Sequence, residues 1–148
     1  MHKHIPFILI LTILGSGFKN KRTTIYFQSS TSYGYQDKGD SIRFIFGEQK
    51  TIKVGGLNIN LDQRRNEIKQ VNLAGDFNGW SPDNSQFILK KTDSKLYFIV
   101  LSKKSLGKKG EIRKFKFVLN GKYWIEPPAE ALNKITGSDL NTNLYLQL

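Results

Sequence analysis

Apolar and polar residues alternate with a period of two along much of the chain after residue 40. Ile42, Phe44 and Phe46 fall on one side of the first such segment, with a charged and an aliphatic residue between them on the other. This alternation is typical of a β-strand that buries one face. The pattern therefore predicts a strand that begins near residue 41.

The same alternation recurs in short segments that turn residues separate. Residues 51–54 and 57–61 flank a Gly-Gly pair, and the Asn-Gly pair at residues 120–121 is typical of a hairpin turn. Further strands are predicted at residues 71–75, 86–91, 96–102, 113–120, 122–125 and 143–148. No segment keeps a helical period, so about seven or eight short strands predict an all-β, immunoglobulin-like sandwich.

The N-terminus has the layout of a secretory signal peptide. A basic start precedes an apolar run over residues 5–14, which is short for a membrane span, and Gly-Ser-Gly follows at residues 15–17. A buried strand and a retained membrane anchor are the alternatives. We expect a signal peptide at residues 1–17, export to the periplasm or cell exterior, and no transmembrane span in the mature chain. Residues 18–40 are expected to form a poorly ordered leader, and residues 41–148 the sandwich.

The residue types that are missing restrict the chemistry of the mature chain. The sequence has no cysteine, which excludes disulfides, thiolate metal sites and a cysteine nucleophile. The two histidines, His2 and His4, would be removed with the signal peptide. Without them, imidazole catalysis and histidine-ligated metals are not available. Asp, Glu, Lys and Tyr remain as candidate catalysts, and we expect no metal and no cofactor.

The formal net charge of +11 is unevenly distributed. Six basic residues crowd one short segment that two glycines interrupt: Lys103, Lys104, Lys108, Lys109, Arg113 and Lys114. An anionic partner such as nucleic acid is one interpretation. No aromatic residue lies within the cluster, as single-strand binding would require, so a solvated loop between strands is the favoured interpretation.

One turn carries the most informative side chain. Residues 71–80 read VNLAGDFNGW, a strand that enters a polar turn and ends on Trp80. An indole ring is costly to expose to water, but its flat face can stack on the apolar face of a sugar ring. Neighbouring amide and ammonium groups can then bond the sugar hydroxyls. Asp76 and Asn78 are interpreted as turn residues that bond their own backbone.

Three separate motifs resemble the glycogen-binding modules of carbohydrate-binding module family 48. They read AGDFNGW at residues 74–80, FKFVLNGKYWIEPP at residues 115–128 and NTNLYL at residues 141–146. The similarity extends over residues 68–148. The resemblance implies an early-set immunoglobulin-like sandwich and a non-catalytic module that binds an α-1,4-glucan such as glycogen or starch.

The resemblance also implies which residues bind the sugar. Trp80 and Trp124 match the two tryptophans of the family's binding platform, and Lys116 matches a lysine that bonds sugar hydroxyls. Asn143 matches an asparagine of the closing strand, with Asn141 as the alternative. Alternation independently places Lys116 on the side of its strand that faces away from the core.

Two features depart from the family pattern. The second hairpin carries one residue more than usual before Trp124, and an extra residue reverses the facing of all later residues in the strand unless a bulge absorbs it. Tyr123 is therefore an alternative to Trp124 as the platform residue. Some family members insert a leucine into the glucan, and both Leu140 and Ile135 are candidates for that position here.

The sequence is compatible with three classes of function. The favoured class is an exported α-glucan-binding module, which a separate carbohydrate-active enzyme could accompany. The alternative is an early-set interaction or structural domain that has lost sugar binding and docks to a partner protein. The third is a small glycosidase with paired carboxylates drawn from Asp76, Asp83, Glu126 and Glu130. It is the weakest, because related proteins place catalysis in a separate barrel.

Overall fold

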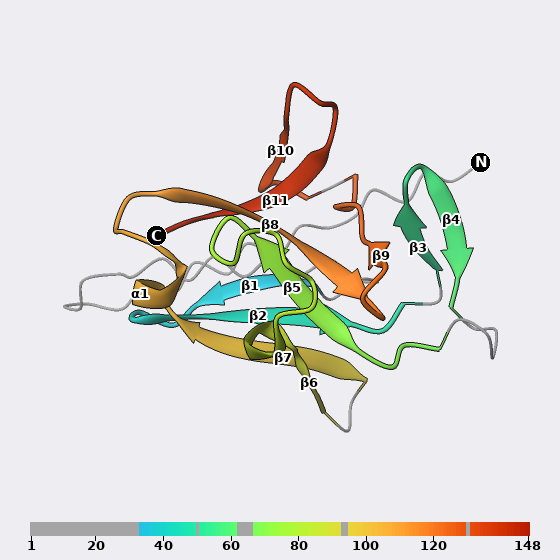
Figure 1. Cartoon of the computed structure of the whole chain (residues 1–148), viewed down its shortest axis with the longest axis horizontal. Coiled ribbons are helices and arrows are strands. Elements are labelled where there is room, and N and C mark those ends of the chain that lie inside the picture. Colours follow the sequence, from blue (N-terminus) through green and yellow to red (C-terminus); the bar gives the residue numbers. More distant parts are fainter. Residues whose placement is uncertain (1–32, 50, 62–66, 93–94, 130) are drawn as a thin grey trace, which may run out of the picture.

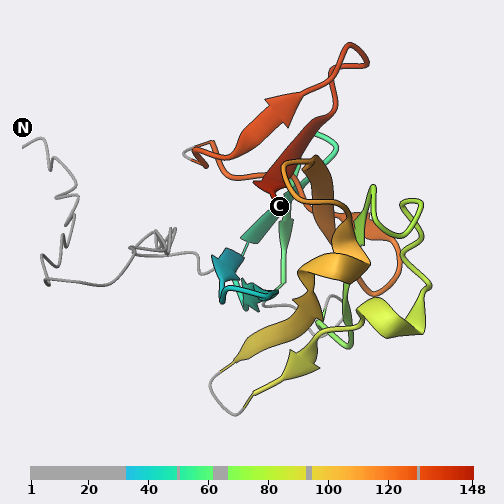
Figure 2. The same cartoon turned by 90° about the vertical axis from the view of Figure 1, so that its left-hand side faces the viewer.

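The alternating segments form strands that build two antiparallel sheets (Figures 1 and 2). The structure is a computed structural model and describes residues 33–49, 51–61, 67–92, 95–129 and 131–148. The first sheet has the order β1-β2-β7-β6. Its strands are β1 (Tyr33–Asp37), β2 (Ser41–Gly47), β7 (Leu96–Ser102) and β6 (Lys90–Lys91).

The second sheet has the order β10-β11-β8-β5, with β9 paired to β8. Its strands are β10 (Lys134–Thr136), β11 (Thr142–Gln147), β8 (Ile112–Leu119), β5 (Val71–Gly75) and β9 (Tyr123–Trp124). A separate hairpin joins β3 (Thr51–Val54) to β4 (Leu57–Asn60), and the β10-β11 hairpin projects from the rest of the fold (Figure 1). The predicted all-β sandwich is confirmed, and the described residues form eleven strands, of which β1 and β10 were not predicted.

Aromatic side chains from both sheets meet in the core. The ring centroids of Phe44 and Phe115 lie 5.1 Å apart, and those of Phe46 and Phe117 lie 5.5 Å apart. All four side chains are at most 1% exposed. These edge-on and tilted contacts join the inner face of β2 to that of β8, as the alternation along both strands predicts.

The folded part of the chain begins earlier than the sequence indicates. Strand β1 lies within residues 18–40, which were expected to be a poorly ordered leader, and it pairs in register with β2 from Tyr33↔Phe46 to Asp37↔Ile42. Strand β1 begins with Tyr-Gly-Tyr, in which a glycine rather than a polar residue separates the apolar positions, so the alternation is not evident in the sequence. The predicted signal peptide at residues 1–17, and residues 18–32, lie outside the described residues.

The single strand predicted at residues 86–91 is wrong. Ser85–Phe87 form a 3₁₀ turn, Ile88 bridges to Asn72 of β5, and only Lys90–Lys91 pair with β7. The segment therefore crosses from the edge of one sheet to the edge of the other. A period of two does not distinguish such a crossing from a continuous strand.

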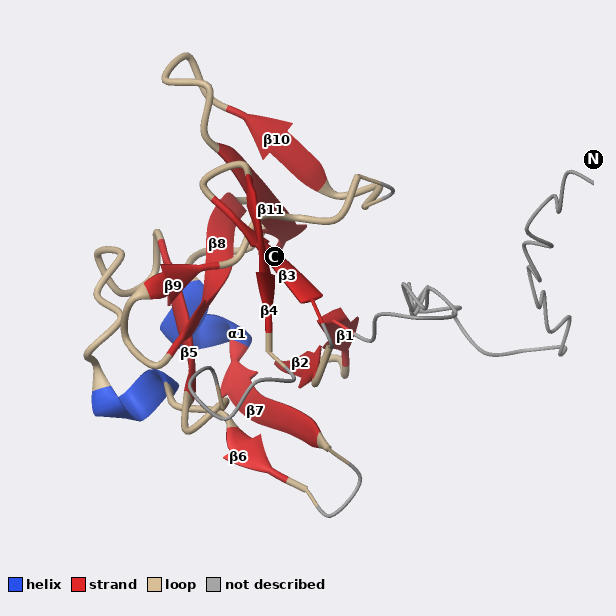
Figure 3. Ribbon diagram, turned by 90° about the vertical axis from the view of Figure 1, so that its right-hand side faces the viewer, coloured by secondary structure: helices blue, strands red, loops and turns tan. Residues whose placement is uncertain are grey.

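The basic segment is ordered rather than an open loop. Lys103–Leu106 form the one-turn helix α1, capped by the Ser102 side chain, and Arg113 and Lys114 already belong to β8. Figure 3 shows that strands dominate and that helical turns are short connections between them. Within the described ranges, no helix is long and apolar enough to cross a membrane.

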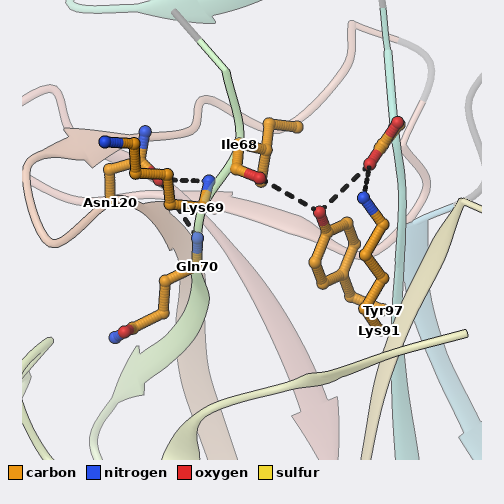
Figure 4. A network of polar contacts seen from close by, with 7 residues as sticks. Ile68, Lys69, Gln70, Lys91, Tyr97 and Asn120 are labelled. Atoms are coloured by element: carbon orange, nitrogen blue, oxygen red, sulfur yellow. Dashed lines mark hydrogen bonds and ion pairs between the residues drawn. The ribbon is translucent and has the colours of Figure 1, made fainter.

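A polar network closes the end of the first sheet (Figure 4). The Tyr97 hydroxyl donates to Glu48 Oε1 at 3.0 Å and lies 3.3 Å from the Ile68 carbonyl oxygen, while Lys91 Nζ lies 2.7 Å from Glu48 Oε1. Partial burial opposes ionisation of Glu48, but the hydrogen bonds from Lys91 and Tyr97 outweigh it and lower its pKa. Ionised Glu48 therefore stabilises the folded state.

We predict that Glu48→Gln makes stability less sensitive to acid. Because the folded-state pKa of Glu48 lies below its ordinary value of 4.5, its contribution is complete above that value and is lost as the pH falls through the folded-state pKa. Wild type should lose roughly 2–4 °C more in Tm than the variant when the pH is lowered from 7 to 3. Glu67→Gln, at an exposed position, is the control. Equal losses of Tm in wild type and Glu48→Gln would contradict this role.

Candidate functional site

The turn after β5 is built by Asn78 and a required glycine. Asn78 Oδ1 accepts from the Gly75 amide at 2.9 Å, and Asn78 Nδ2 donates to the Leu73 carbonyl at 2.9 Å. A Cβ on Gly75 would lie 2.4 Å from the Lys114 carbonyl oxygen, so a side chain would push β5 away from β8. The interpretation of Asn78 as a residue that bonds its own turn is confirmed.

Asp76 has a different role from the one that the sequence suggests. Its Oδ1 accepts from Trp80 Nε1 at 3.0 Å, and its Oδ2 accepts from the Lys114 amide at 2.8 Å. The carboxylate therefore ties the indole of Trp80 to β8. Trp80 has a φ of 59°, a left-handed backbone that a bulky residue rarely adopts, and the Asp76 hydrogen bond helps to hold it there.

The hairpin from β8 to β9 decides which aromatic residue reaches the outer face. Asn120 and Gly121 have φ values of 53° and 71°, and Leu119 pairs with Tyr123, which leaves three residues in the loop. This loop takes up the additional residue. Trp124 consequently lies opposite Val118 on the outer face, while Tyr123 packs against the core.

Trp124, rather than Tyr123, is thus the residue beside Trp80. Their ring centroids lie 6.4 Å apart, with an angle of 34° between the ring planes. Both side chains are partly exposed. They border an open groove of about 300 Å³ whose lining residues are Trp80, Lys116, Trp124, Asp139, Asn141 and Asn143.

Lys116 is largely buried at this groove. It is 8% exposed, although alternation along β8 points it away from the core. Burial lowers the pKa of its ammonium group, and the negative charges of Glu126 and Asp139 oppose that shift. Lys116 makes no hydrogen bond or ion pair with any described residue, so its donors are available to a ligand.

Strand β11, the last strand of the chain, supplies the remaining wall of the groove. Asn143 lies in β11 next to Leu144, which pairs with Phe115, and this register brings Asn143 beside Lys116. Asn141, the alternative to Asn143, also lines the groove, so the two candidates are brought together rather than separated. The four predicted residues Trp80, Lys116, Trp124 and Asn143 therefore surround one groove.

Asp139 is the lining residue that the sequence motifs did not indicate. It lies in the turn between β10 and β11, where its two carboxylate oxygens accept from the Asn141 amide and side chain at 3.1 and 2.7 Å. The Asp-x-Asn spacing at residues 139–141 is the signal that predicts this turn. Nothing in that spacing shows which way the turn faces, because this depends on the β10-β11 pairing.

The two candidates for an inserted leucine lie on the same projecting hairpin. Leu140 is 84% exposed and Ile135 is 36% exposed, and neither belongs to the groove lining. Leu140 has a φ of 63° at the end of the turn. The structure thus leaves both side chains outside the groove.

The carboxylates considered for glycosidase chemistry bond the chain itself where they are described. Asp76 holds Trp80, and Glu126 accepts from the Gly56 amide at 2.6 Å. Asp83 is exposed, and Glu130 lies outside the described residues. In the described ranges, no three acidic or histidine side chains gather as a metal site would require.

Comparison of the chain with known protein families gives no match, and comparison with curated proteins gives none either. The resemblance to family 48 therefore depends on the three short motifs. Their residues contribute five of the six side chains that line the groove.

We predict that Asp76→Ala loosens the Trp80 ring. Loss of the two hydrogen bonds should lower Tm by roughly 2–4 °C and increase quenching of tryptophan fluorescence by acrylamide. Asp83→Ala removes an exposed carboxylate from the same loop and should change neither quantity. Unchanged quenching in Asp76→Ala would show that the carboxylate does not hold the indole.

Proposed function

We propose that this protein is an exported, non-catalytic module that binds α-1,4-glucan, of the kind that family 48 represents. The observation that carries the proposal is the pairing of two partly exposed indoles with an unpaired, buried lysine in one open groove. Indole faces stack on the apolar faces of sugar rings, and the ammonium group binds hydroxyls. Tryptophans at wet surfaces and unpaired buried charges are both costly without a ligand.

The angle between the indoles favours a curved chain. Two rings inclined at 34° cannot both lie flat against an extended, planar ribbon of sugars. An α-1,4-linked glucan curves, so successive sugar rings present inclined faces. Two neighbouring glucose units of an α-1,4-linked chain therefore fit the inclination of the two indoles better than two neighbouring units of a β-1,4-linked chain.

The polar side chains around the indoles complete the recognition. Lys116 supplies donors only, and the amides of Asn141 and Asn143 supply both donors and acceptors. Sugar hydroxyls also donate and accept, so they match this set. Stacking on the indoles supplies the apolar contact area, and the polar groups fix the orientation of the sugar.

An open groove of this size implies weak binding. We expect affinities in the micromolar to millimolar range for one site, since little of the ligand is enclosed. A polymer with many equivalent segments, or a separate carbohydrate-active enzyme attached to the same polymer, would raise the effective affinity. The proposal includes export, because residues 1–17 have the pattern of a signal peptide.

We predict that Trp80→Ala and Trp124→Ala each abolish the retardation of the protein in native gels that contain glycogen or amylopectin. Each substitution removes half of the stacking surface and should weaken binding at least about tenfold. Phe98→Ala is the matched control, since Phe98 lies in the first sheet, under the Arg43 guanidinium, and outside the groove lining. Retardation that survives both tryptophan substitutions, in variants that retain wild-type circular dichroism, would contradict the proposal.

We predict that Lys116→Met weakens binding of maltoheptaose about tenfold, because it removes the charged donor while keeping the volume of the side chain. Lys104→Met is the control, since Lys104 is exposed in α1 and lies outside the groove lining. Isothermal titration calorimetry measures both. If Lys116→Met and wild type bind maltoheptaose with equal affinity, Lys116 does not contribute to sugar binding.

A further inference from the structure

The groove holds a fixed acceptor as well as a donor. Among the described residues that line the groove, Asp139 is the one acidic residue, and the Asn141 hydrogen bonds fix both of its carboxylate oxygens. The turn that carries Asp139 is closed by the Leu140 amide, which donates to the Gly137 carbonyl at 3.1 Å, and by the Gly137 amide, which donates to the Asn141 carbonyl at 2.9 Å. The carboxylate is therefore held in place before any ligand binds.

Asp139 remains charged at neutral pH and below. Hydrogen bonds from the Asn141 side chain and backbone lower the pKa of its carboxyl, and the positive charge of Lys114 lowers it further. An ionised carboxylate accepts hydrogen bonds and cannot donate them. Lys116, in the same groove, can only donate.

The charges of Asp139 and Lys116 interact across the groove that both residues line, but the two side chains do not form a direct ion pair among the described residues. A sugar hydroxyl donates one hydrogen bond and accepts others, so a single glucose unit can satisfy both groups. A phosphate monoester carries mainly acceptor oxygens and negative charge, so Asp139 would repel it and offset the attraction that Lys116 exerts.

We propose that Asp139 is a specificity-determining residue of the groove, which accepts hydrogen bonds from the hydroxyls of the bound glucan and disfavours glucan that carries phosphate. This inference rests on the proposed function and adds the ligand class, a neutral glucan. The net charge of +11 would otherwise attract anionic polysaccharides to the protein. Asp139 places a compensating negative charge in the groove itself.

The test compares two forms of one polymer. Affinity electrophoresis is run in gels with native, phosphorylated potato amylopectin and with the same amylopectin after phosphatase treatment. Wild type should bind the dephosphorylated polymer several-fold more tightly. Asp139→Asn should lose about tenfold in affinity for maltoheptaose by calorimetry, and it should lose the preference against phosphate.

Two further variants separate charge from structure. Asp139→Glu keeps the charge and should keep the preference against phosphate, whereas Asp83→Asn, outside the groove, should behave as wild type. The double variant Lys116→Met/Asp139→Asn should lose less affinity than the two single losses combined, since both groups bind the same sugar. Thermal unfolding checks that each variant is folded.

The outcomes distinguish this inference from the proposed function. If wild type binds neither polymer, the proposed function fails, and the inference fails with it. If Trp80→Ala abolishes binding while Asp139→Asn retains both the affinity and the preference of wild type, the function stands and the role of Asp139 is overturned. Loss of the preference in Asp139→Asn alone supports the inference.

Discussion

The second part of β8, residues 115–119, is buried on both faces, and this constraint connects the core of the sandwich to the groove. Phe115 and Phe117 fill the interior against β2, while Lys116 between them is 8% exposed on the outer face. A shift of one residue along β8 would exchange the two sets of side chains. The aromatic contacts of the core therefore also fix the position of Lys116 in the groove that the indoles border.

Much of the fold can be predicted from local alternation, and the exceptions have physical causes. The inward side chains of β2 and β8 are evident from the sequence, because each strand has one strongly apolar face. Strand β1 begins with Tyr-Gly-Tyr and lacks that contrast, and the crossing at residues 86–91 has the period of a strand without being one. The alternation within a segment does not reveal whether that segment pairs with a strand that is distant in the sequence.

The candidate site was predictable in part. The motifs indicate Trp80, Lys116, Trp124 and Asn143, and the structure brings them together at one groove. The choice between Tyr123 and Trp124 required the three-residue loop, since the extra residue alone predicts reversed facing. Asp139 was missed because its position depends on how the β10-β11 hairpin is placed against β8.

The most direct test of the central claim follows the indole N–H signals of the protein by nuclear magnetic resonance during titration with maltoheptaose. The chain has two tryptophans, and both border the groove. Binding of one curved glucan across both rings predicts that both signals shift along the titration with one dissociation constant. Two signals that stay unmoved at millimolar maltoheptaose, or a shift of only one of them, would contradict a shared platform.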